Sequence, residues 1–264
     1  MIQDKRRLSR LVPLIGVVCM STSVVFIRHA TAPSMVLALY RMVLSVLLML
    51  PSALILGRGK WKKGLRPADW LSWAASGVCF GLHFLCYFFS VQYTTITTAV
   101  MLSSTEVFYV ALCAYVFLHE RISPRGWVGI GVTFVGCVLL AFAQGMQGGQ
   151  NALGMLTGIL AAVFAGLFTL FGRRCRAKVG NTQYTFVVFV FGSLTLLTGC
   201  LLSGQRLTGY GADNLAAALA MAVMCTLLGH SLLTWSLRYQ PASYVSSVKM
   251  LVPVSSTFFG WVFV

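Results

Sequence analysis

The sequence predicts an all-α polytopic membrane protein with nine of the ten transmembrane helices of a fold built from two inverted five-helix repeats. Charged residues make up 9% of the 264 residues and hydrophobic residues 58%, whereas a soluble domain carries about 25% charged residues. Nine apolar segments are long enough to cross a bilayer, and the two halves of the chain match each other. The composition excludes a soluble enzyme, a disordered chain and a nucleic-acid-binding domain, despite a formal net charge of +15.

The apolar segments are expected to be helices, because an isolated strand would leave its backbone polar groups unpaired in lipid. Crossing the hydrocarbon core takes roughly 20 helical residues. The first segment is long for the core of a signal peptide, so we expect it to remain in the protein as the first helix. The predicted spans are Leu11–His29, Ser34–Leu56, Trp70–Gln92, Thr97–Leu118, Arg125–Ala143, Ala152–Gly172, Tyr184–Ser203, Asn214–Ser236 and Ser243–Val264.

Basic residues predict which ends of the spans face the cytoplasm, since Lys and Arg accumulate on that side of a membrane. With the N-terminus inside, sixteen of the twenty basic residues fall in cytoplasmic segments, and the outer side holds Arg28 and Arg206. The remaining two, Arg41 and Lys249, lie within spans. We therefore expect a multi-pass protein of the cytoplasmic membrane with a cytoplasmic N-terminus and basic loops that face anionic lipid.

The two halves of the chain match at an offset of 146 residues, which places Ser90–Tyr93 over Ser236–Tyr239. The spans of the two halves also agree in length and loop spacing, so the predicted domains are residues 1–145 and 146–264. Because five helices are an odd number, the second copy enters the membrane from the opposite side. Inverted repeats of this kind are typical of secondary transporters, whose binding site lies at the repeat interface near the midplane.

The same offset predicts a tenth helix. The first copy continues past Phe117 through Glu120 into a fifth helix that contains Gly129 and Gly136. The chain ends at Val264, two residues before the expected counterpart of Glu120. We therefore expect the second repeat to lack its last helix in this chain.

Several stretches in order carry a family resemblance: Ala38–Arg41, Ser103–Phe108, Leu118–Ile122, the glycines Gly129 and Gly136, and Leu251–Val254. Over essentially its whole length the chain resembles the drug/metabolite transporter (DMT) superfamily, EamA type. The resemblance implies ten helices in two inverted repeats, a central cavity, and transport of small metabolites without ATP hydrolysis. The family often has proline in the middle of the fourth and ninth helices. Here Val107 follows Glu106, whereas the ninth span keeps Pro253, which is expected to kink this helix.

Glu106 is the most informative single residue. It is the tenth residue of its predicted span, so at 1.5 Å per residue it lies about 15 Å deep, near the midplane. A charge there must face a partner or a wet cavity. One interpretation is a carboxylate that binds a cationic group or carries a coupling proton. The other is a structural ion pair with Arg41 or Lys249.

Lys249 belongs to a polar stripe on the ninth span, where Ser246, Lys249, Pro253 and Ser256 recur at helical spacing. Such a stripe belongs on a cavity wall or a helix interface, because lipid offers no hydrogen bonds to it. The alternative is that the long Lys249 side chain reaches the headgroups. Arg41 is expected either to contact an anionic substrate group or Glu106, or to anchor the second span at the interface.

His83 and His230 lie in the third and eighth spans. Histidine titrates near neutrality and could relay protons, although a buried histidine more often hydrogen-bonds to a neighbour. Tyr87 shares a helix face with His83, and it belongs to an aromatic run that fits helix packing better than an aromatic substrate site. Ser103 lies one helical turn before Glu106.

Gly129 and Gly136 are seven residues apart and therefore share one helix face, where small side chains allow close helix packing in lipid. We expect them to pack against a neighbouring helix, with a homodimer contact as the alternative. The eight cysteines form no C-x-x-C pair and no zinc-type spacing, which predicts packing roles, no metal and no cofactor.

The sequence as a whole predicts a secondary transporter, not an enzyme, that moves a small metabolite by alternating access and uses proton coupling through Glu106. The alternatives are an intramembrane enzyme and a membrane protein without transport activity. An enzyme needs clustered chemistry such as paired aspartates, H-E-x-x-H or G-x-S-x-G, and the sequence has none of these. It also lacks a P-loop for ATP. The predicted cavity residues are Arg41, His83, Tyr87, Ser103, Glu106, His230, Ser246 and Lys249.

Overall fold

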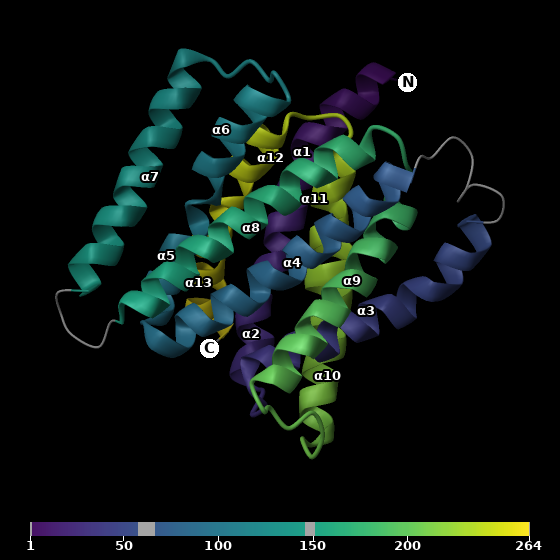
Figure 1. Cartoon of the computed structure of the whole chain (residues 1–264), viewed down its shortest axis with the longest axis vertical. Coiled ribbons are helices and arrows are strands. Elements are labelled where there is room, and N and C mark those ends of the chain that lie inside the picture. The colour runs from purple at the N-terminus through teal and green to yellow at the C-terminus, as the bar shows by residue number, and fades with distance from the viewer. Residues whose placement is uncertain (1, 58–66, 146–150, 264) are drawn as a thin grey trace.

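The computed structural model describes residues 2–57, 67–145 and 151–263, and these residues form helices joined by short connections (Figure 1). The helices of the first half are α1 (Ile2–Ser21), α2 (Ser23–Arg28), α3 (Ser34–Gly57), α4 (Pro67–Tyr93), α5 (Ile96–Ser104), α6 (Glu106–Phe117) and α7 (Pro124–Gly145). Those of the second half are α8 (Ala152–Arg176), α9 (Asn181–Leu202), α10 (Ala212–Met221), the π-helix η1 (Ala222–His230), α11 (Ser231–Ser236), α12 (Ala242–Lys249) and α13 (Leu251–Phe263).

Eight segments of the described residues are long and apolar enough to cross a membrane, and each overlaps one of the predicted spans. The predicted fifth span, Arg125–Ala143, corresponds to α7, a helix of 22 residues. The polytopic all-helical class is therefore confirmed. That this fifth span crosses the membrane, and that the repeats are inverted, stay predictions.

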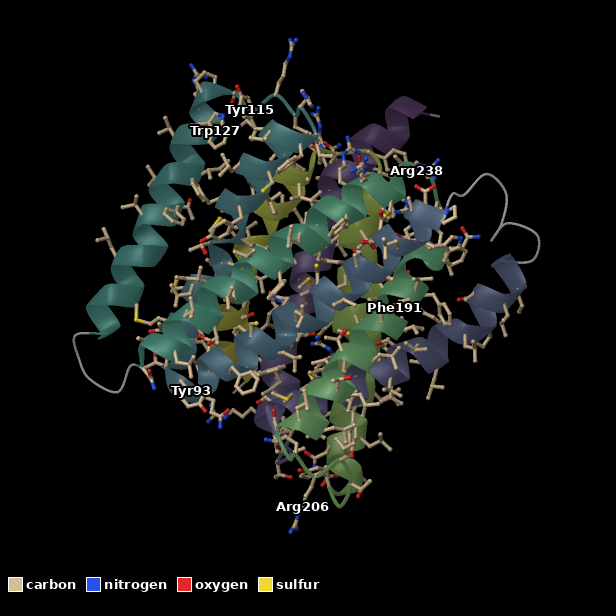
Figure 2. All side chains as sticks on the ribbon, in the orientation of Figure 1. Tyr93, Tyr115, Trp127, Phe191, Arg206 and Arg238 are labelled. Carbon is tan, nitrogen blue, oxygen red and sulfur yellow. The ribbon has the colours of Figure 1, made fainter. Side chains whose placement is uncertain are left out.

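The helices run back and forth between two ends of the bundle. In Figure 1 the N-terminus lies at the same end as the connections that follow α6 and α11, and the C-terminus lies at the other. Figure 2 shows Trp127 and Arg238 at the first end and Tyr93 and Arg206 at the second. This separation of Arg238 from Arg206 is the one that the charge pattern predicts. Which end faces the cytoplasm stays a prediction.

The centre of the bundle is closely packed because glycines let helices approach. Helix α4 packs against α8 and α9. A Cβ atom added at Gly77 of α4 would lie 2.6 Å from Phe191 Cβ and 2.8 Å from the Val188 carbonyl oxygen, both on α9. In lipid, van der Waals contact between helices takes the place of the hydrophobic effect. Here α4 and α9 can make this contact because Gly77 has no side chain.

The periphery differs from the centre. Helix α7 lies at one edge of the bundle and packs against α5 and α6 (Figure 1). A Cβ added at Gly129 or Gly136 would meet no atom within 4 Å among the described residues. In the described part of the chain, the side of α7 where these glycines lack a side chain therefore faces open space, unlike the close packing that we expected there. The homodimer contact stays a prediction.

Two predicted spans are each divided into half-helices. The break in the fourth span was not expected, whereas a kink at Pro253 was expected in the ninth. The fourth span breaks at Thr105, whose N–H and hydroxyl both donate to the Leu102 carbonyl, at 3.1 and 2.6 Å. The ninth span breaks at Met250, whose N–H donates to the Ser247 carbonyl at 3.2 Å. Pro253 contributes to the second break because it has no N–H to offer the carbonyl four residues earlier.

Candidate functional site

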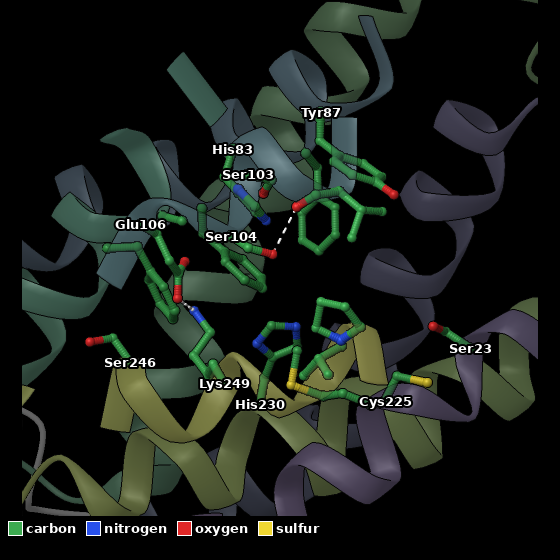
Figure 3. A pocket seen from close by; sticks show the side chains of 18 of the residues that line it. Ser23, His83, Tyr87, Ser103, Ser104, Glu106, Cys225, His230, Ser246 and Lys249 are labelled. Atoms are coloured by element: carbon green, nitrogen blue, oxygen red, sulfur yellow. Dashed lines mark hydrogen bonds and ion pairs between the residues drawn. The ribbon is translucent and has the colours of Figure 1, made fainter. Parts of the chain in front are cut away.

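The candidate functional site is a cavity of about 210 Å³ inside the bundle, which the two broken spans and η1 help to enclose. Figure 3 shows His83, Ser104 and Glu106 on one side of this cavity and His230 and Lys249 on the other. The structure brings together all of the predicted cavity residues, and Pro253 lines the same cavity. Those residues are Arg41, His83, Tyr87, Ser103, Glu106, His230, Ser246 and Lys249.

An ion pair joins the two broken spans across the cavity. Lys249 Nζ lies 2.5 Å from Glu106 Oε1, and the side chains are 15% and 8% exposed. The partner of Glu106 is thus Lys249, one of the two alternatives that the sequence left open. A charge without a partner at this depth would cost about 2.5–3.5 kcal/mol on insertion scales, so each side chain makes the burial of the other tolerable.

The breaks in the helices place both charges favourably. Glu106 is the first residue of α6, where the helix dipole is positive, and Lys249 is the last residue of α12, where the dipole is negative. Each of these placements stabilises a charge by about 0.3–1 kcal/mol, and more when partly buried. Two continuous helices would offer no such ends at this depth, so the broken spans place each charge at the helix end of opposite sign.

Arg41 is a further basic residue in the cavity wall. It is 7% exposed, and its guanidinium carbon lies 4.7 Å from the centre of the Phe84 ring, a cation–π contact. Its Nε and Nη2 atoms are buried and have no hydrogen-bond partner among the described residues. Arg41 therefore neither pairs with Glu106 nor reaches the interface. Because Lys249 and Glu106 cancel, the cavity carries a formal charge of +1 when both histidines are neutral.

The two histidines differ in their contacts. His83 Nδ1 lies 2.9 Å from the Ala161 carbonyl oxygen, so it must donate a hydrogen there. This bond orients the His83 ring and ties α4 to α8. His230 instead meets the Phe80 ring edge-to-face at 4.9 Å between ring centres. The sequence favoured buried histidines that hydrogen-bond to a neighbour, and His83 makes such a bond.

His230 ends a π-helix, a feature that the sequence did not signal. In a π-helix the backbone bonds join residues five apart, and both Cys225 and His230 line the cavity. The Thr226 hydroxyl donates to the Met221 carbonyl at 3.5 Å, with the same separation of five. In a regular α-helix, Cys225 and His230 would not share one face, so the α-helical period does not predict that both line the cavity.

Aromatic side chains make up much of the remaining wall. Phe80, Phe84 and Phe168 line the cavity, and the rings of Phe80 and Phe168 are 4.6 Å apart. Phe80 and Phe84 belong to the aromatic run of α4 that includes Tyr87, for which helix packing was expected. Both residues pack in the core, and both also face the cavity. Ser23 and Ser104 also line the cavity and were not predicted.

Among the described residues, no group of three His, Cys, Asp or Glu side chains could hold a metal ion.

A second polar network lies at one end of the bundle, at the N-terminus of α12. Glu120, in the connection after α6, accepts hydrogen bonds from the backbone N–H groups of Ala242 and Ser243, at 3.0 and 3.4 Å. It also pairs with Arg173 Nε at 3.3 Å. Glu120 therefore caps the N-terminus of α12, the half-helix that carries Lys249, a role that was not predicted for Glu120.

Comparison with known proteins finds transporters. The chain is 25% identical over 234 residues to an uncharacterized transporter of Archaeoglobus fulgidus, which covers 85% of this chain and 78% of that protein. It is 25% identical to an uncharacterized transporter of Clostridium kluyveri, covering 64% of this chain and 56% of that protein. It is 24% identical to the pseudopaline exporter CntI of Pseudomonas aeruginosa, covering 71% of this chain and 64% of the exporter.

A solved crystal structure superposes on this chain with a TM-score of 0.73, over 98% of this chain and 89% of its own, at 19% sequence identity. At this identity the likeness establishes the fold alone. The profile of the EamA-like transporter family matches residues 9–142 and 152–264. These two ranges include almost the whole sequence and every residue of the cavity. The chain therefore belongs to the EamA-like transporter family, within the drug/metabolite transporter superfamily.

Proposed function

We propose that this protein is a secondary transporter that moves a small metabolite across the cytoplasmic membrane by alternating access at the cavity. The observation that carries the proposal is the Lys249–Glu106 pair, which links half-helices of the two halves of the chain across a cavity. Discontinuous helices at the repeat interface, with helix ends facing the bound solute, are a recurring design of secondary transporters. Enzymes and channels do not need this arrangement.

The proposal includes two inverted repeats, residues 1–145 and 146–264, and an N-terminus in the cytoplasm. The two ranges that match the family profile, 9–142 and 152–264, support this division. The two breaks support it too, because the offset of 146 places Thr105 over Leu251, next to the break at Met250. The cavity volume is below the roughly 300–1,000 Å³ of pockets for drug-sized ligands, so a small metabolite fits best.

Alternating access requires that the contacts between the two halves change. The Lys249–Glu106 pair is one such contact, and the Glu120 contacts with α12 and Arg173 are another at one end of the bundle. A substrate that competes for Lys249 or Glu106 would loosen the first contact. We infer that opening at the Glu120 end then requires the second contact to separate, because both hold α12.

Proton coupling through Glu106 is part of the proposal. A proton on this carboxylate would remove its charge and weaken the bond to Lys249, so that protonation and release of α12 are linked. The test is uptake driven by a pH gradient in proteoliposomes. Glu106→Gln mimics the protonated acid, so it should remove the dependence of uptake on the pH gradient. Full gradient-driven uptake by this variant would contradict the coupling role.

Transport itself is testable before the substrate is known. Proteoliposomes are loaded with an isotope-labelled extract of bacterial metabolites, and the compounds released are identified by mass spectrometry. We expect the wild-type protein to release a small subset of compounds that protein-free liposomes retain. If no compound is released faster than from protein-free liposomes, the proposed function is contradicted.

A further inference from the structure

We propose that Arg41 is the anchor of an anion subsite, which binds the carboxylate or phosphate oxygens of a small organic anion with an apolar body. This inference rests on the proposed function, because it names the chemical class of the transported molecule. Among the described residues, Arg41 is the charged residue of the cavity that has no partner of opposite charge.

The protein supplies no counter-charge of its own to Arg41 in the described residues. The chain has five acidic residues, and Glu106 is the one that lines the cavity. Its carboxylate lies 2.5 Å from Lys249. Asp69 pairs with Lys178 and Glu120 with Arg173, both away from the cavity. A buried guanidinium with no anion is costly in an apolar environment, so a bound anion would relieve this cost.

The unpaired atoms of Arg41 have the geometry for an anion with two oxygens. Nε and Nη2 lie on the same edge of the planar guanidinium, and both are buried without a hydrogen-bond acceptor. An edge of this kind donates two parallel hydrogen bonds to a carboxylate or phosphate. The guanidinium also contacts the ring of Phe84, which fixes its position while the edge stays available.

The surroundings of Arg41 indicate the rest of the ligand. Phe80, Phe84 and Phe168 form an aromatic wall of the same cavity. Apolar and aromatic groups pack well on such a wall. A volume of about 210 Å³ restricts the ligand to a small one. Together these features favour a small carboxylate or phosphate ester with an apolar or aromatic part, over a sugar or a simple inorganic ion.

The test measures binding and does not depend on transport. The purified protein in phosphatidylcholine nanodiscs is titrated with a size series of acids and their neutral amides, from acetate and acetamide to 3-phenylpropionate and 3-phenylpropanamide, together with phenyl phosphate. For the best-fitting member we expect the anion to bind at least about tenfold more tightly than its amide, which is the effect of charge-assisted hydrogen bonds. If no anion in the series binds more tightly than its neutral partner, the proposal is wrong.

Variants then assign the discrimination to Arg41. Arg41→Gln should bring the anion and the amide to within about twofold of each other, with amide binding retained as proof of a folded cavity. Arg41→Lys keeps the charge but loses the two-donor edge, so it should keep part of the discrimination. Arg206→Gln is the matched control, because Arg206 is exposed at the end of the bundle, and it should behave as the wild type. Full discrimination in Arg41→Gln would overturn the proposal.

Two further arms separate the alternatives. An anionic lipid could present the same phosphate chemistry, so the titration is repeated in nanodiscs that contain phosphatidylglycerol. Unchanged binding supports a soluble anion, and loss of binding would overturn that assignment in favour of lipid. Discrimination between anion and amide without metabolite release from proteoliposomes would refute transport and leave the anion subsite standing. Metabolite release without discrimination between anion and amide would support transport and refute the anion subsite.

Discussion

Two lysine–carboxylate pairs in this protein have the same length and different surroundings. Lys249 Nζ lies 2.5 Å from Glu106 at the cavity, and Lys178 Nζ lies 2.5 Å from Asp69, where the connection after α8 meets the first turn of α4. The lysine side chains are 15% and 52% exposed, respectively. An exposed pair contributes about 0–1 kcal/mol, whereas removing one partner of a buried pair costs about 3–5 kcal/mol. The burial of a pair, and not its length, therefore determines how much stability the protein loses when one partner is removed.

Breaking the buried pair on one side should have the largest effect. Lys249→Met leaves Glu106 buried without its partner, so we expect a loss of about 3–5 kcal/mol in the free energy of unfolding. Unfolding titrations in mixed micelles measure this loss. The double variant Lys249→Met/Glu106→Gln removes both charges and should recover most of the stability. If the double variant is no more stable than the single one, the pair does not account for the loss.

The packed centre should respond next. Gly77→Ala places a Cβ against the backbone of α9, so we expect a loss of about 1–3 kcal/mol in unfolding free energy because the helices must separate. The same titration measures this variant. Gly136→Ala on the uncovered face of α7 is the matched control, and there we expect no loss, or a gain of up to about 1 kcal/mol from helix propensity. Equal losses at both positions would contradict the contrast between centre and edge.

The cap on α12 should have an intermediate to small effect. Glu120→Ala removes the acceptors of the Ala242 and Ser243 N–H groups and the partner of Arg173. We expect a loss of about 1–2 kcal/mol in unfolding free energy, as for other helix caps. Hydrogen exchange should rise at the first turn of α12 and stay unchanged in α9. Unchanged exchange in α12 would mean that Glu120 does not hold this half-helix.

The exposed pair should matter least. Lys178→Met changes the same residue type at the same distance as Lys249→Met, but in contact with solvent. We expect a change of less than about 1 kcal/mol in unfolding free energy and wild-type release of metabolites from proteoliposomes. A loss comparable to that of Lys249→Met would remove the distinction between the two pairs.

The sequence was sufficient for eight of the predicted spans and for the charged residues of the cavity, but not for its aromatic wall or for Ser23 and Ser104. Charges and polar stripes are rare inside apolar segments, so Glu106, Lys249 and Arg41 were recognisable from position alone. The partner of Glu106 was not predictable, because it depends on which helices lie side by side. Thr105 carries no signal of a helix break, whereas Pro253 does. The π-helix before His230 and the uncovered face of Gly129 and Gly136 likewise depend on tertiary packing.

The central claim is that transport depends on the charges of Lys249 and Glu106 and not merely on the fold that they help to stabilise. The most direct measurement is metabolite release from proteoliposomes that contain the double variant Lys249→Met/Glu106→Gln, compared with Lys178→Met/Asp69→Asn. We expect the cavity variant to stay folded and release nothing above protein-free liposomes, while the exposed variant releases at the wild-type rate. Wild-type release by the folded cavity variant would contradict the account.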